Sequence, residues 1–137
     1  MSKPGNSASS FVRMFKPQFA GLVERGEKTQ TVRPTPKRMP RPGDRISLRC
    51  WTGKPYRSKQ RVLMESTITR VETIRISAAG IMLLGGGLLA SRTMDDEFAR
   101  ADGFDHFPEM ADWFQQTHGL PFDGIVIHWQ NAKHTPR

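Results

Sequence analysis

The clearest pattern in the chain is a strict alternation of apolar and polar residues over 45–51. Ile46, Leu48 and Cys50 fall on one face of this segment, because successive side chains of a strand point to opposite sides. The opposite face carries arginines, a serine and a tryptophan. Further strands are predicted at 11–15, at 124–129 and over 62–76, the last as one long bent strand or two short ones.

Three other segments are predicted as helices: 17–26, 95–103 and 105–118. The first and the third space their apolar residues as a helix does, whereas the second has acids in its first turn and a glycine at its end. In the first of them, Phe19, Leu22 and Val23 fall at i, i+3 and i+4. A glycine closes or follows each segment, and glycine is the residue that most often ends a helix. The third segment carries an apolar stripe that we expect to lie in the core, formed by Met110, Trp113 and Phe114.

The length of 137 residues predicts one domain. We expect a flexible N-terminus over 1–10, a single domain over 11–130 and a C-terminal tail over 131–137. Residues 77–91 show the least clear pattern, because three successive glycines interrupt an apolar run. We interpret this segment as a hairpin or an insertion.

The composition excludes several classes of protein. Cys50 is the only cysteine, so no intrachain disulfide can form. No apolar run approaches the ~20 residues that span a bilayer, and the N-terminus lacks an apolar signal segment, so we expect a cytoplasmic protein without a membrane partner. The four histidines and Cys50 show no metal-ligand spacing. We therefore assign no metal, no cofactor and no obligate protein partner.

The formal net charge of +8 favours anionic partners. Residues 33–61 hold ten basic residues against one acid, and two aromatic residues lie among them. Cations interleaved with aromatics suit single-stranded nucleic acid, because phosphates need charge and unstacked bases need a ring face. A solubilising basic loop remains the alternative. The candidate binding residues are Arg33, Lys37, Arg38, Arg45, Arg49, Trp51 and Tyr56.

The segment 26–33 concentrates the candidate chemistry. Gly26 is expected to end a helix, after which β-branched residues favour an extended segment that Pro34 terminates. Lys28, Thr31 and Arg33 lie within this short segment. They are either reactive groups at the start of a strand or ordinary edge charges and strand formers.

These motifs together resemble the ASCH domain family, of the PUA-like superfamily, and in particular its longer bacterial and phage members. The resemblance rests on Gly26-x-Lys28-Thr29-x-Thr31-x-Arg33, on Pro42-Gly43-Asp44 before a strand, on 98–104, and on 119–129 with its final tryptophan. It covers roughly residues 11–130. It implies an α+β fold, a small mixed β-barrel with short flanking helices, around a positively charged cleft for RNA or a modified nucleoside.

A compact branch of this family hydrolyses the acetyl amide of N4-acetylcytidine with a lysine, a threonine and a distant glutamate. By motif, these residues correspond here to Lys28, Thr31 and Asp102, an aspartate in place of the glutamate. Our first hypothesis is therefore an amidohydrolase in which Lys28 activates the Thr31 hydroxyl. Since Lys28 and Thr31 would point to opposite faces of a regular strand, Lys28 must lie in the turn before it.

Two alternatives stay open. The first is a non-catalytic RNA-binding module in which the basic residues hold phosphates and Trp51 or Tyr56 stacks on a base. The second is a ribonuclease, which ranks last because no pair of histidines has a useful spacing. For Asp102, the residues alone allow either an exposed carboxylate or one held for a purpose.

Overall fold

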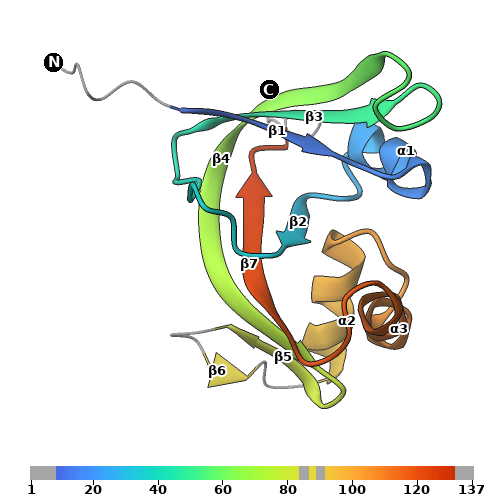
Figure 1. The fold of residues 1–137 in the computed structure, drawn as a ribbon. Helices are drawn as coiled ribbons and strands as arrows, with labels where there is room; N and C mark the ends of the chain where they lie inside the picture. Colours follow the sequence, from blue (N-terminus) through green and yellow to red (C-terminus); the bar gives the residue numbers. More distant parts are fainter. Residues whose placement is uncertain (1–8, 84–86, 89–91, 132–137) are drawn as a thin grey trace, which may run out of the picture.

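The computed structural model describes residues 9–83, 87–88 and 92–131. Within them the chain forms seven strands and three helices (Figure 1). In chain order they are β1 (Ser10–Met14), α1 (Pro17–Arg25), β2 (Gln30–Arg33), β3 (Arg45–Trp51), β4 (Gln60–Ser77), β5 (Gly80–Leu83), β6 (Gly87–Leu88), α2 (Arg92–Ala101), α3 (Phe107–Thr117) and β7 (Phe122–Trp129).

Strand β4 organises the sheet. It is 18 residues long and curves through the molecule (Figure 1), so that its two halves pair with different neighbours. The first half pairs antiparallel with β3, which in turn pairs parallel with β1. The second half pairs antiparallel with β7, and its end pairs with β5. The register with β7 shifts between Ile68 and Arg70, near the expected bend. One long bent strand is thus the correct alternative for 62–76.

The α+β class is confirmed, but the expected closed barrel is not. Strand β2 pairs with β7, and β1 pairs with β3. No ladder joins β1 to β2 among the described residues, so the sheet stays open there. A side chain bridges the two strands instead, because Arg33 Nη2 donates to the Met14 carbonyl oxygen at 2.9 Å. Residues of both strands line a cavity at this opening.

The core lies between the curved sheet and the three helices. Helix α1 buries Phe19 and Val23, and Gly26 ends it with a left-handed φ of 79°, as the pattern predicted. On β7, the successive residues Ile125, Val126 and Ile127 are all buried. Strand β7 is therefore covered on both faces.

Helices α2 and α3 lie side by side near the start of β7 (Figure 1). Strands β5 and β6 pair antiparallel, as the hairpin alternative for 77–91 requires, while 84–86 and 89–91 lie outside the described residues. The expected flexible N-terminus and tail also lie mostly outside them. Ordered contacts reach Asn131, whose Nδ2 donates to the Gly26 carbonyl oxygen at 2.9 Å. None of the described helices is long and apolar enough to cross a membrane.

Candidate active site

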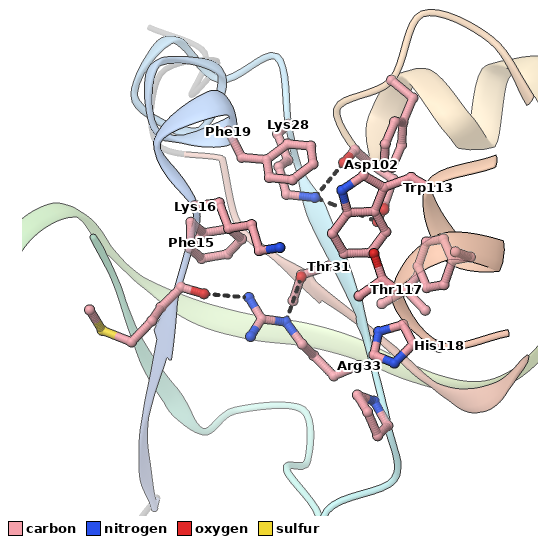
Figure 2. A pocket seen from close by; sticks show the side chains of 15 residues that line it. Phe15, Lys16, Phe19, Lys28, Thr31, Arg33, Asp102, Trp113, Thr117 and His118 are labelled. Atoms are coloured by element: carbon pink, nitrogen blue, oxygen red, sulfur yellow. Dashed lines mark hydrogen bonds and ion pairs between the residues drawn. The ribbon is translucent and has the colours of Figure 1, made fainter. Parts of the chain in front are cut away.

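A cavity of about 250 Å³ opens beside the gap between β1 and β2. The end of β1, helix α1, strand β2, the segment after α2 and helix α3 all contribute to it, and Figure 2 shows their side chains converging. Five aromatic residues contribute to its walls, with Phe19 and Trp113 in edge contact at a ring-centroid distance of 6.0 Å. The aromatic lining residues are Phe15, Phe19, Phe104, Trp113 and Phe114.

Lys28 reaches this cavity from the turn between α1 and β2. The Gly26 cap reverses the chain, and the Lys28 N–H donates to the Leu22 carbonyl oxygen at 3.0 Å. Strand β2 begins at Gln30, so Lys28 lies in the turn before the strand. This position allows Lys28 and Thr31 to face the same cavity. Its side chain is 3% exposed and points toward Asp102 (Figure 2).

Asp102 directly follows the last residue of α2. Its N–H donates to the carbonyl oxygens of Phe98 and Ala99, which continues the helical pattern for one more residue. The backbone of this segment is joined to the turn before β2, since the Thr29 N–H donates to the Ala101 carbonyl oxygen at 2.9 Å. Asp102 is 3% exposed. Of the two alternatives left by the sequence, the exposed carboxylate is therefore wrong.

Lys28 and Asp102 form a buried ion pair. Lys28 Nζ donates to the Asp102 carbonyl oxygen and lies 3.7 Å from Asp102 Oδ1. The aspartate, shorter than the glutamate of the resembling enzymes, is therefore long enough to reach the lysine. Asp102 Oδ1 accepts no hydrogen bond from the described residues, but the carboxylate interacts with Lys28 and with the nearby buried Gln30 side chain.

Burial perturbs both ionisable groups of the pair. It lowers the pKa of Lys28 from 10.5 to about 8; Asp102 opposes this shift and Arg33 adds to it. Burial also raises the pKa of Asp102 from 3.8 to about 6, against the opposing effects of Lys28, Gln30 and Arg33. Phe19 compensates part of the lost hydration of the ammonium, since Lys28 Nζ lies 5.0 Å from its ring centroid. At pH 7 about one tenth of Lys28 is therefore a free amine.

Thr31 and Arg33 project from the same face of β2, because they are two residues apart on a strand. Thr31 is buried, and its Oγ1 accepts a hydrogen bond from Arg33 Nε at 2.9 Å. Accepting this bond leaves the hydroxyl hydrogen free to be donated elsewhere. Burial, with Arg13 nearby, lowers the pKa of Arg33 to about 10. Arg33 also packs on the Phe15 ring at 4.9 Å, which fixes its guanidinium at the cavity.

Sequence reasoning missed three lining residues. Trp113 was expected in the core, but it is half-buried and forms a wall of the cavity. Lys16, next to Pro17, received no role, yet its Nζ lies 5.3 Å from the Trp113 ring centroid. His118, for which the sequence indicated only the absence of metal-ligand spacing, is exposed and lines the cavity. In the sequence, only the position of Lys16 between a predicted strand and a predicted helix could have indicated a place in the site.

The other basic candidates do not line this cavity. Lys37 and Arg38 lie on the exposed loop between β2 and β3, where Arg38 covers the Phe11 ring at 4.0 Å. Arg45 Nη1 donates to Thr67 Oγ1, and Arg49 donates to Ser47 Oγ on its own strand and to Gln60 Oε1 on β4. Trp51 and Tyr56 line a separate hollow that shares three residues with the cavity, Met14, Phe15 and Lys16. Among the described residues, no group of three His, Cys, Asp or Glu side chains could hold a metal ion.

No protein-family model matches the chain, and no curated protein matches it either. The structure is similar to a crystal structure of an ASCH domain from Lactobacillus crispatus JV V101, with a TM-score of 0.56 at 16% sequence identity. The similarity covers 89% of this chain and 79% of the other. A match of this extent at low identity establishes the fold. The chain therefore has the fold of an ASCH domain, the family whose motifs its sequence resembles.

Proposed function

We propose that this protein is an amidohydrolase that removes a small acyl group from an exocyclic amide of a nucleobase, with N4-acetylcytidine as the first candidate substrate. One observation carries the proposal: a buried lysine of lowered pKa, its buried carboxylate partner and a threonine hydroxyl line the same aromatic-walled cavity. Phosphate binding alone would require neither the threonine nor a buried carboxylate.

The size and lining of the cavity suit one base. Its volume of about 250 Å³ lies just below the ~300–1,000 Å³ common for drug-sized ligands. Phe19 and Trp113 offer ring faces for a planar base. The Asp102 carboxylate lines the cavity and can accept an N–H of the base.

The reaction follows from the protonation states. Neutral Lys28 takes the proton of the Thr31 hydroxyl while Thr31 Oγ1 attacks the acyl carbonyl carbon. Arg33, bonded to Thr31, is placed to stabilise the oxyanion that forms. When the carbon–nitrogen bond breaks, the Lys28 ammonium returns the proton to the exocyclic nitrogen of the base. Water then hydrolyses the threonine ester, which releases acetate and restores the hydroxyl. Asp102 holds the lysine in place and stabilises its charged form.

The test is acetate release from N4-acetylcytidine by the purified protein, by Lys28→Met and by Thr31→Val. We expect turnover by the wild type and none by either variant. Thr73→Val is the matched control, because Thr73 is exposed on β4 and does not line the cavity. Circular dichroism checks that each variant is folded. Unchanged turnover in Thr31→Val would refute the assignment of the nucleophile.

The pH dependence tests the same proposal. Because Lys28 must be neutral, kcat/KM should rise with pH and level off above about 8. Protonation of Asp102 should reduce it further below about 6. If the wild type releases no acetate but binds RNA in a salt-sensitive manner, the amidohydrolase proposal fails. The non-catalytic RNA-binding module would then be the correct alternative.

A further inference from the structure

A second hollow adjoins the cavity and has no role in the chemistry above. Its volume is about 310 Å³. It lies between the end of β1, the start of α1 and the loop that joins β3 to β4. Phe15 and Lys16 line both spaces and form the wall between them. The complete lining is Met14, Phe15, Lys16, Pro17, Trp51, Gly53, Pro55 and Tyr56.

Tyr56 is the unusual residue of this hollow. It is 88% exposed, so its ring is not part of the buried core. It is also the only non-glycine residue with a positive φ, 63°, among the described residues. This backbone conformation is unfavourable for a residue with a bulky side chain. Since the core does not need the ring, its strained and exposed position points to a binding role.

The surrounding loop holds the Tyr56 ring in place. The ring contacts Trp51, the last residue of β3, at a centroid distance of 5.1 Å. Across the base of the loop, the Thr52 N–H donates to the Lys59 carbonyl oxygen at 2.9 Å. Ser58 Oγ accepts from the Gly53 N–H and donates to the Lys54 carbonyl oxygen. The aromatic pair is therefore preorganised, which lowers the entropic cost of binding.

The charge around this aromatic pair suits a polyanion. Residues 45–64 hold six basic residues and no acid. The loop itself carries Lys54, Arg57 and Lys59, all of them exposed. Lys16 lies at the boundary of the two spaces, where a phosphate that joins two nucleotides would pass. A free nucleoside would leave all of these groups unused.

We propose that the second hollow is a subsite for the nucleotide adjacent to the modified base in single-stranded RNA. The neighbouring base stacks on Tyr56 beside Trp51, and Lys16 contacts the connecting phosphate. This inference rests on the proposed function, because it takes the first cavity to hold the modified cytosine. The substrate is then an N4-acetylcytidine within an RNA strand, bound more tightly than the free nucleoside.

The experiment compares a short RNA that contains one central N4-acetylcytidine with the free nucleoside. Binding and acetate release are measured for the wild type, Tyr56→Phe and Tyr56→Gly. Glycine adopts the left-handed backbone without strain, so Tyr56→Gly removes the ring and keeps the loop conformation. We expect Tyr56→Gly to bind the RNA about tenfold or more weakly, as loss of one stacked base predicts. Tyr56→Phe should bind as the wild type does, and neither variant should change turnover of the nucleoside.

Salt dependence tests the phosphate contact. Lys16→Ala should reduce the slope of log K against log salt for the RNA by about 0.7, the value for one phosphate of a single strand. Equal affinity of the wild type for RNA and nucleoside, or full RNA binding by Tyr56→Gly, would overturn the subsite. Acetate release from the nucleoside in that case would leave the proposed function intact. Conversely, Tyr56-dependent RNA binding without any acetate release would support the subsite and refute the hydrolase.

Discussion

The substitution Asp102→Asn removes the charge that keeps Lys28 protonated. A pKa of about 8 in place of 10.5 means that the fold disfavours the Lys28 ammonium by about 3 kcal/mol, even with Asp102 opposing. Leaving a buried charge unpaired typically costs ~3–5 kcal/mol. Deprotonating an amine of pKa about 8 at pH 7 costs only about 1 kcal/mol. We therefore expect Lys28 to become neutral in this variant rather than remain an unpaired cation.

The assay is the free energy of unfolding in urea between pH 4 and pH 10. In the wild type, the raised pKa of Asp102 stabilises the fold at low pH, and this contribution is lost as pH rises through about 6. The lowered pKa of Lys28 gives a contribution that grows as pH rises from about 8 toward 10.5. Asp102→Asn should abolish the first change. In this variant, the rise in the free energy of unfolding that comes from Lys28 should begin below pH 8, because the charge that raised the pKa of Lys28 is gone.

The matched control is Asp123→Asn, which makes the same change on an exposed ion pair. Asp123 Oδ1 lies 2.7 Å from Arg75 Nε at the surface, where solvent screens the interaction. The free energy of unfolding of Asp123→Asn should vary with pH as that of the wild type does above pH 6. Parallel curves for the wild type and Asp102→Asn over the whole range would refute the reasoning, because the buried pair would then not control either titration.

Two further predictions concern the same pair. Gly103→Ala should lower the melting temperature and acetate release more than Gly43→Ala does. Both glycines have a positive φ, 102° at Gly103 and 95° at Gly43. Only at Gly103 would the added Cβ contact other side chains, Phe19 at 3.0 Å and Lys28 at 3.2 Å. Equal losses would show that backbone strain alone matters. The double variant Lys28→Met/Asp102→Leu should match or exceed the wild-type stability in urea, because replacing a buried ion pair by apolar residues of similar volume is often neutral or stabilising by ~1–4 kcal/mol. It should release no acetate, and retained release would contradict the assigned chemistry.

The sequence by itself determined most of the local structure. Apolar periodicity located the strands and helices, and Gly26 marked the turn that carries Lys28 into the site. These features depend on backbone geometry within a few residues, so they can be read from neighbouring positions. The motif resemblance then indicated the ASCH fold, which the structure confirms. The same resemblance indicated Thr31, three residues from Lys28, as a candidate site residue.

Only the tertiary structure decided how distant residues combine. Asp102 is 74 residues from Lys28, and its burial depends on how the end of α2 docks against the turn before β2. The pKa shifts of both groups follow from that packing, since desolvation is the largest cause of each. The separation of Arg45 from the cavity and the recruitment of Trp113 to it have the same origin. Composition can count charges and rings, but the curvature of β4 and the packing of the helices decide which of them share a surface.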